Sequence, residues 1–230
     1  MMEAIVLAGG FGSRLREAVP DLPKPMAPIA GEPFLEILLR SLARNGFRNV
    51  IVSLGFMADK ISSYFGTSFA GMQLKYVIED NPLGTGGAVR LALSQCQEDH
   101  AFIFNGDTYL SFEASIVEDL WQRHQHPIIL ARALEDTSRY GRLLVSDGFV
   151  QGFCEKGLPG PGLINAGCYV LSAHQLDAWP LNSPFSLEKD FFVHAVKLQP
   201  VDVFETSGLF IDIGVPDDYQ SAQELLAGVV

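Results

Sequence analysis

Short apolar runs alternate with helical patterns through roughly the first 130 residues, and this alternation limits the possible folds more than any other feature. The apolar runs predict buried strands at residues 4–7, 49–54, 74–78, 101–104 and 128–131. Between them, helices are expected from Pro33 to near Gly46, around 61–65, over 88–93 and over 116–121. Strands that alternate with helices predict a parallel sheet covered on both faces.

The pattern becomes more mixed in the remainder of the chain. Further strands are expected at 143–145, 150–153, 166–171 and 201–204, with helices only at 187–196 and from Asp217. No linker or low-complexity segment separates the two parts. We therefore expect one α/β domain over residues 1–230, in which a smaller mixed part lies on the edge of the first sheet.

Composition limits the possible partners and the compartment. The formal net charge of −11 argues against nucleic-acid and membrane partners, because those surfaces attract basic patches. The three cysteines are widely spaced, which favours reduced thiols in the cytoplasm. The first apolar run is too short for a signal peptide or a membrane span. We expect a cytoplasmic protein, and a homo-oligomer is left open.

A glycine-rich segment follows the first apolar run. Gly9, Gly10 and Gly12 precede Arg14, but the spacing fits neither a P-loop nor a dinucleotide-binding fingerprint. Glycines let backbone amides approach an anion closely, and an arginine can donate two parallel hydrogen bonds to two oxygens of one phosphate. The segment predicts a phosphate-binding loop, with a tight turn and a surface arginine as the alternative.

Lys24 stands between two prolines in the same segment. Proline restricts its own backbone and that of the preceding residue, so Lys24 is expected to be extended and stiff. A fixed ammonium suits charge that develops in a transition state. The alternative is an ordinary lysine in a proline-rich loop.

Two acids occupy equivalent places after apolar runs. Asp107 follows the fourth predicted strand, and Asp212 follows an apolar run near the end of the chain. In open α/β sheets, ligands bind outside the carboxyl ends of the strands. The two carboxylates would hold one Mg²⁺ together with substrate phosphates, whereas an aspartate in a turn is the simpler explanation of Asp107.

Other polar residues suggest sites for a base and a sugar. Glu79, after the third strand, offers acceptors for the N–H groups of guanine, or it caps a turn. The glycines from Gly84 would admit a flat ring or simply start a helix. Lys156 and Asn165 lie near later strand ends and suit a sugar phosphate, while Glu188 fits a sugar site or the first turn of a helix.

Together these segments resemble the sugar-nucleotidyltransferase family over nearly the whole chain. The signature reads GGFGSRL at 9–15, PKPM at 23–26 and GEP at 31–33. Supporting motifs follow in family order: GTGGA at 84–88, NGD at 105–107, YG at 140–141, NAG at 165–167 and DIG at 212–214. The chain departs from the family where Arg16 follows Leu15, since a proline is common there.

The resemblance implies a fold and an activity. The expected fold is a three-layer, mostly parallel, Rossmann-like sheet with a smaller mixed sugar-binding lobe. Residues up to about 130 would bind a nucleoside triphosphate, and residues 131–230 would bind a sugar 1-phosphate. The enzyme would transfer a nucleoside monophosphate to that sugar phosphate and release pyrophosphate.

The resemblance also implies roles for individual residues. The catalytic residues would be Arg14, Lys24 and Asp107, with Mg²⁺ held by Asp107 and Asp212. The nucleotide would contact Leu7, Ala8, Gly9, Gly10, Gly12, Ser13, Glu79, Gly84 and Thr85. The sugar phosphate would contact Gly141, Glu155, Lys156, Asn165 and Glu188.

Three stretches narrow the resemblance further. The segments at 22–39, 185–192 and 210–219 are most similar to short bacterial guanylyltransferases that act on D-glycero-α-D-manno-heptose 1-phosphate, which supply GDP-heptose for surface polysaccharide. The alternatives are a mannose 1-phosphate guanylyltransferase, an N-acetylmuramate or hexose 1-phosphate uridylyltransferase, and a non-catalytic homologue that binds NDP-sugars.

Overall fold

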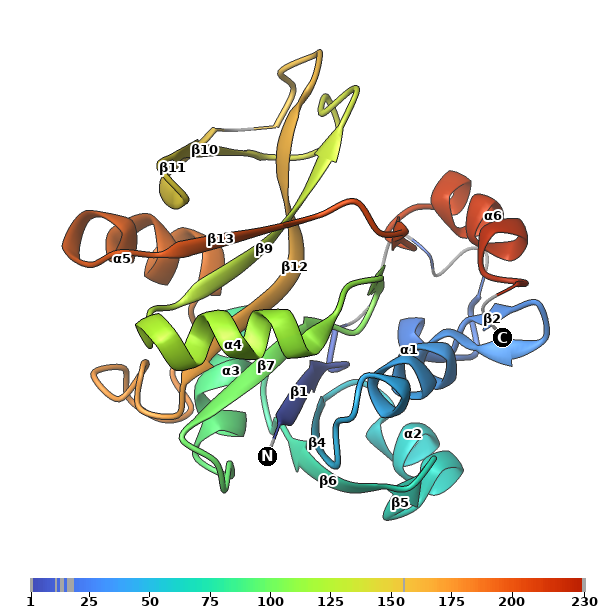
Figure 1. The fold of residues 1–230 in the computed structure, drawn as a ribbon. Helices are drawn as coiled ribbons and strands as arrows, with labels where there is room; N and C mark the ends of the chain where they lie inside the picture. The colour runs from blue at the N-terminus through green and yellow to red at the C-terminus, as the bar shows by residue number, and fades with distance from the viewer. Residues whose placement is uncertain (1, 11, 13–14, 16–18, 155, 229–230) are drawn as a thin grey trace.

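A computed structural model describes residues 2–10, 12, 15, 19–154 and 156–228 of the chain. Its centre is a ten-stranded sheet with the order β10-β11-β13-β9-β12-β7-β1-β4-β6-β5 (Figure 1). The parallel block of this sheet consists of β1 (Glu3–Leu7), β4 (Asn49–Leu54), β6 (Met72–Ile78) and β7 (His100–Asn105). These four strands confirm the first four predicted from the apolar runs.

Helices cover both faces of the sheet, as the alternation predicts. One face packs against α1 (Phe34–Arg44), α2 (Ala58–Phe65) and α4 (Ala114–His124). The other face packs against α3 (Gly84–Leu93), a π-helical segment (Leu187–Phe192) and α5 (Val193–Leu198). Side chains alternate along a strand, so Ala4 and Val6 of β1 enter the first core and Ile5 enters the second.

The second half of the chain extends the same sheet. Its strands are β9 (Ile128–Leu134), β10 (Arg142–Ser146), β11 (Phe149–Cys154), β12 (Gly162–Ser172) and β13 (Asp202–Thr206). β12 runs antiparallel to both β7 and β9, and β13 runs parallel to β9. The predicted α/β class is confirmed, and the sheet as a whole is mixed.

The fifth predicted strand is confirmed as β9, but it does not adjoin the parallel block. β9 does not pair with β7, because the eleven-residue strand β12 lies between them. The nearly continuous burial of β12 makes it a central strand. A strand from later in the chain thus lies between β7 and β9. The apolar pattern alone contains no information on which strands pair.

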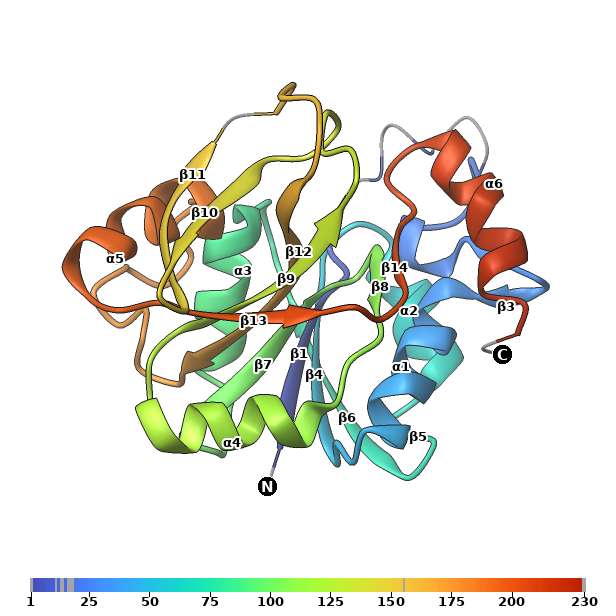
Figure 2. The same ribbon diagram turned by 45° about the horizontal axis from the view of Figure 1, so that its top comes forward.

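Small elements connect distant parts of the chain beside the main sheet. They are a 3₁₀ turn (Lys24–Met26), β2 (Pro28–Ile29), β3 (Glu32–Pro33), β5 (Ser68–Phe69), β8 (Thr108–Leu110), β14 (Phe210–Asp212) and α6 (Pro216–Leu225). β14 pairs with β8 and sets Asp212 opposite Thr108. Figure 2 shows α6 near α1 and β3. Residues of α1, β2 and α6 share a third apolar core.

Neither disulfides nor membrane-spanning helices contribute to the described part of the structure. Cys96, Cys154 and Cys168 are all free thiols. Cys168 is buried in β12, where burial raises the pKa of its thiol well above the ordinary value. No helix among the described residues is both long and apolar enough to cross a bilayer.

Candidate active site

A cavity of about 590 Å³ opens at the carboxyl ends of β1, β4, β6 and β7. Its volume is in the range of about 300–1,000 Å³ that is typical of small-molecule sites. It is lined by Leu7, Ala8, Gly9, Gly10, Gly12, Lys24, Pro25, Gly55, Phe56, Glu79, Asp80, Asn81, Pro82, Gly84, Thr85, Ala88, Asn105, Gly106, Asp107 and Gly214. The site therefore lies at the edge of the sheet where open α/β folds bind ligands.

Glycines allow the strand ends to come together at this edge. A Cβ on Gly9 would lie 2.8 Å from Glu79 Oε1, and one on Gly106 would lie 2.5 Å from the carbonyl oxygen of Leu7. A Cβ on Gly55 would lie 2.9 Å from the carbonyl oxygen of Gly9. No side chain fits at these three positions unless neighbouring atoms move. The glycines therefore let the strand ends approach closely, and main-chain atoms form this part of the cavity wall.

Lys24 and Asp107 form an ion pair at the cavity. Lys24 Nζ donates a hydrogen bond of 2.6 Å to Asp107 Oδ2, and only 9% of the lysine side chain is exposed. The prediction that Lys24 is extended is wrong: Lys24 begins a 3₁₀ turn, and the extended residue is Pro23, with ψ of 145°. Two hydrogen bonds fold this turn, from Met26 N–H to Pro23 and from Ala27 N–H to Lys24.

Asp212 lies next to Asp107. The N–H of Ile213 donates to the carbonyl oxygen of Asp107 at 3.0 Å, and the N–H of Gly214 donates to Asp212 Oδ1 at 2.6 Å. Burial, and then the charge of Asp107, raise the pKa of the Asp212 carboxyl, although Lys24 acts in the opposite direction. Two neighbouring carboxylates that repel each other suit a divalent cation, which would neutralise both.

Glu79 both caps a turn and lines the cavity, the two roles considered for it in the sequence. Its Oε2 accepts the N–H of Leu83 at 2.9 Å, and Ser53 Oγ donates to its Oε1 at 3.3 Å, so it caps the turn that leads to α3. It also lines the cavity. Burial raises the pKa of the Glu79 carboxyl against these two hydrogen bonds. A carboxylate oxygen has lone pairs for further donors, so capping leaves room for a ligand.

The glycines after Glu79 start a helix. Gly84 is the first residue of α3 and has a left-handed φ of +67°. A Cβ on Gly86 would lie 2.2 Å from the ring of Phe185. Gly86 is therefore required for the helix to pack on the segment before residue 187, whereas Gly84 and Thr85 line the cavity.

A hydrogen-bonded network joins the cavity to the second half of the chain. Thr85 Oγ1 donates to Glu188 Oε2 at 2.8 Å, and Tyr169 donates its hydroxyl to Glu188 Oε1 at 3.1 Å. Asn165 Nδ2 in turn donates to the Tyr169 hydroxyl at 2.9 Å. Tyr169 is buried, and burial raises the pKa of its phenol, so the hydroxyl remains a donor. Two predicted sugar-site residues, Asn165 and Glu188, thus belong to one network.

Among the described residues, no hydrogen bond joins Gly141 or Lys156 to this network. They flank the hairpin of β10 and β11, whose register pairs Arg142 with Cys154. A Cβ on Gly141 would lie 3.1 Å from the carbonyl oxygen of Cys154, and Lys156 is exposed. These two residues therefore lie at one end of the hairpin.

The predicted site residues fall into three groups. Ten line the cavity: Leu7, Ala8, Gly9, Gly10, Gly12, Lys24, Glu79, Gly84, Thr85 and Asp107. Five do not line it: Gly141, Lys156, Asn165, Glu188 and Asp212. Ser13, Arg14 and Glu155 lie outside the described residues.

Sequence reasoning missed several members of the site. Gly55 and Phe56 line the cavity directly after β4, and the strand-end rule applied to the second apolar run would have found them. Tyr169 was not singled out, because a tyrosine inside an apolar strand gives no signal of a hydrogen-bonded hydroxyl. Its partners are four and nineteen residues away in sequence, and only the folded chain brings Glu188 to it.

Comparison with known proteins identifies the family. The family model described as Nucleotidyl transferase matches residues 3–228. A D-glycero-alpha-D-manno-heptose 1-phosphate guanylyltransferase from Aneurinibacillus thermoaerophilus is 38% identical over 229 residues, which cover 98% of each chain. A mannose-1-phosphate guanylyltransferase from Mycobacterium tuberculosis is 31% identical over 235 residues, which cover 99% of this chain and 66% of that relative.

A solved structure supports the same assignment. The crystal structure of HddC from Yersinia pseudotuberculosis complexed with GMP-PN superposes with a TM-score of 0.88 at 35% identity. The match covers 98% of this chain and 100% of that one. The predicted family resemblance is confirmed: the chain belongs to the nucleotidyl transferase family.

Proposed function

We propose that this protein transfers GMP from GTP to D-glycero-α-D-manno-heptose 1-phosphate, releasing pyrophosphate and forming GDP-heptose in the cytoplasm. The observation that carries the activity is the cavity at four strand ends, with Lys24 and Asp107 on its wall and Asp212 beside them. The choice of GTP and heptose phosphate is supported by the full-length relative with 38% identity.

The reaction needs no nucleophile from the protein. An oxygen of the sugar 1-phosphate attacks the α-phosphorus of GTP, and a new P–O bond forms. The bond from the α-phosphorus to the oxygen shared with the β-phosphorus breaks, and that oxygen leaves with pyrophosphate. The protein therefore contributes alignment of the two phosphates and neutralisation of their charge.

Asp107 and Asp212 are proposed to hold Mg²⁺. The adjacent carboxylates offer hard oxygen ligands, and substrate phosphates would complete the coordination shell. Bound Mg²⁺ would offset negative charge on the transferring phosphate. Lys24 would exchange its contact with Asp107 for the triphosphate and stabilise charge on it. The roles of Ser13 and Arg14 at the same phosphates rest on the resemblance.

The remaining residues are proposed to select the base and the sugar. Leu7, Ala8, Gly9, Gly84 and Thr85 would surround the nucleoside, and Glu79 would accept the N–H groups of guanine. Glu188 and Asn165 would contact sugar hydroxyls through the network that Tyr169 holds together. Lys156, at the end of the hairpin of β10 and β11, would bind the phosphate of the sugar 1-phosphate, and Gly141 would contact sugar hydroxyls. The proposed contact of Glu155 with sugar hydroxyls rests on the resemblance.

A substrate panel tests the proposal. Pyrophosphate release is measured for GTP, ATP, UTP and CTP, each with heptose, mannose, glucose and N-acetylmuramate 1-phosphates. We expect the highest kcat/KM for GTP with the heptose phosphate. A preference for UTP would contradict the assigned base, and no turnover with any pair would favour a non-catalytic NDP-sugar-binding protein.

Mannose 1-phosphate is the second candidate acceptor. It is supported by the relative from Mycobacterium tuberculosis, which is similar over nearly the whole of this chain. Highest kcat/KM for GTP with mannose 1-phosphate would select this alternative and leave the guanylyl transfer itself intact.

A further inference from the structure

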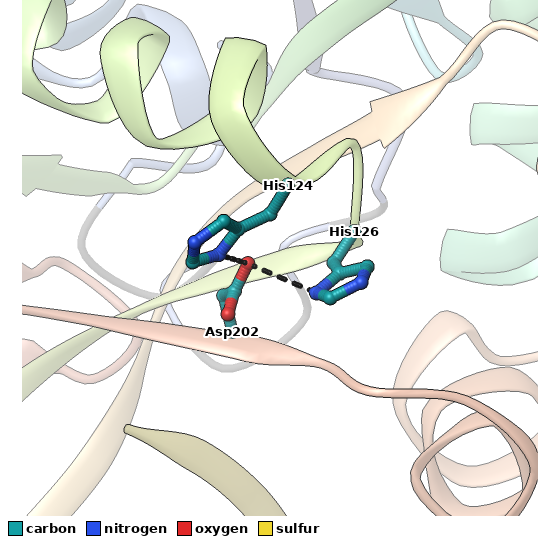
Figure 3. A group of neighbouring side chains, drawn as sticks. All are labelled: His124, His126 and Asp202. Atoms are coloured by element: carbon teal, nitrogen blue, oxygen red, sulfur yellow. Dashed lines mark hydrogen bonds and ion pairs between the residues drawn. The ribbon is translucent and has the colours of Figure 1, made fainter. Parts of the chain in front are cut away.

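Three metal-ligating side chains meet outside the cavity. His124 is the last residue of α4, His126 lies just before β9, and Asp202 is the first residue of β13. Figure 3 shows both imidazoles turned toward the Asp202 carboxylate. His124 Nδ1 lies 2.9 Å and His126 Nδ1 lies 3.4 Å from Asp202 Oδ2.

The cluster lies at the opposite edge of the sheet from the cavity. β9 is antiparallel to β12, and β12 is antiparallel to β7, so β9 runs in the same direction as β7. The cavity is at the carboxyl ends of the parallel block, whereas the cluster is where β9 and β13 begin. The cluster is therefore separate from Asp107 and Asp212.

Local backbone geometry holds the three side chains together. Gln125 adopts a left-handed φ of 54° and ends α4, so the chain turns between the two histidines. The N–H of Asp202 donates to the carbonyl oxygen of Pro127 at 2.8 Å, which fixes the start of β13 against the same segment. The ligand atoms of His124, His126 and Asp202 all lie within 4.8 Å of one another.

The hydrogen bonds within the cluster do not satisfy all of its polar atoms. The Asp202 side chain is only 4% exposed, and its ion-pair partners among the described residues are the two imidazoles, with no lysine or arginine. Both histidines present Nδ1 to the same carboxylate oxygen, yet His126 Nδ1 is buried and makes no hydrogen bond in the described part of the chain. A buried nitrogen without a hydrogen bond costs free energy, and a metal ion would satisfy it.

The donor set indicates the kind of metal. Two imidazole nitrogens and a carboxylate oxygen suit zinc, whereas Mg²⁺ prefers oxygen ligands alone. Zn–ligand bonds of about 2.0–2.1 Å in a tetrahedron separate the ligand atoms by about 3.3 Å. The distances of 2.9 and 3.4 Å in the cluster lie on either side of this value.

We propose that His124, His126 and Asp202 bind Zn²⁺ through the two Nδ1 atoms and a carboxylate oxygen. The His124 and His126 side chains are 40% and 33% exposed, which leaves a path for the ion and a position for a water as fourth ligand. The ion links the end of α4 to the start of β13, because its ligands His124 and Asp202 are 78 residues apart in the sequence. Its role is structural, because the site is at the far edge of the sheet from the cavity.

Calorimetric titration with ZnCl₂ tests the site on the full chain after EDTA treatment and removal of the chelator. We expect one Zn²⁺ per chain and a rise in Tm on binding. His126→Gln should weaken binding at least tenfold and remove the Tm shift, because loss of even an indirect ligand contact typically costs about 10–100-fold. Asp202→Asn should weaken binding similarly.

His174→Gln provides the matched control. His174 Nδ1 lies 2.9 Å from Asp177 Oδ2 in an exposed pair that is not part of the cluster, so this variant should bind Zn²⁺ as the unchanged chain does. Absence of Zn²⁺ binding by the unchanged chain, or equal affinity of the His126→Gln variant, would overturn the proposal. If Asp202→Asn fails to fold, His126→Gln, which changes a partly exposed side chain, still decides the outcome.

Discussion

At the scale of single residues, Lys24 links the backbone of the first loop to the chemistry of the cavity. Its ammonium is almost entirely removed from solvent and is bound to Asp107. Burial of an ammonium is costly unless an anion lies beside it, and the Asp107 carboxylate is that anion. The same geometry makes Lys24 available to a triphosphate, which is a stronger anion in the same place.

Removal of the Lys24 ammonium should reduce catalysis more than binding. We expect Lys24→Ala to lower kcat for pyrophosphate release by roughly 100-fold or more, as for other charges that act on a transition state. Steady-state kinetics at saturating substrates measures this. Lys75→Ala removes an exposed lysine on β6 and should keep the original kcat. Full turnover of the Lys24→Ala variant would exclude the assigned role.

Glu79 is the residue proposed to recognise the guanine base of GTP. A glutamine in its place can still accept the Leu83 N–H, but its amide offers a donor where the carboxylate offers only acceptors. Glu79→Gln is therefore expected to reduce the ratio of kcat/KM for GTP over UTP by roughly tenfold, corresponding to about 1.4 kcal/mol. Glu224→Gln, far along the chain in α6, serves as control. An unchanged ratio would remove Glu79 from base recognition.

At the scale of secondary-structure elements, short pairings bring the two acids together. β8 and β14 have three residues each, and neither would be stable alone. Their antiparallel register sets Asp212 opposite Thr108, next to Asp107. The sequence indicated that both acids follow apolar runs, but it contained no signal that the segment directly after Asp107 pairs with the run that ends at Asp212.

Tyr169 tests how α3, β12 and the π-helical segment depend on one another. Tyr169→Phe leaves Asn165 Nδ2 and Glu188 Oε1 without their shared partner, and we expect a loss of about 1–3 kcal/mol in the free energy of unfolding. The KM for the sugar 1-phosphate should rise more than the KM for GTP. Urea denaturation and steady-state kinetics measure the two effects.

Tyr76→Phe is the control for this network. The Tyr76 hydroxyl donates to the carbonyl oxygen of Gly66 at 2.7 Å, in an exposed hydrogen bond that is not part of the network. Its loss should change neither KM and should cost less stability. An equal rise of both KM values in the Tyr169→Phe variant would indicate general loosening of the fold rather than loss of sugar-site positioning.

At the scale of the whole molecule, one sheet carries the proposed nucleotide and sugar sites together. β12, from the second half of the chain, pairs directly with β7, from the first half. The two principal cores extend under strands of both halves. Because the proposed sites share one continuous sheet and its cores, we expect the orientation of the sugar phosphate toward the cavity to depend on the folding of the complete chain.

The two proposed metal sites, at opposite ends of the strands, predict separate metal requirements. EDTA should stop pyrophosphate release, and excess Mg²⁺ should restore it, because Asp107 and Asp212 provide oxygen ligands. The His126→Gln variant should respond to Mg²⁺ as the unchanged chain does, since its site is elsewhere. Full activity in EDTA would contradict the assignment of Asp107 and Asp212 to a metal.

The sequence by itself determined the α/β class, the first four strands, the helices that cover them and the family motifs. These features depend on local periodicity and turn chemistry, which neighbouring residues encode directly. Only the tertiary structure decided that β12 separates β7 from β9, that Asp212 meets Asp107, and that Tyr169 joins Asn165 to Glu188. The physical reason is that strand pairing and side-chain hydrogen bonds between distant residues depend on which surfaces are buried together, and apolar pattern does not specify partners.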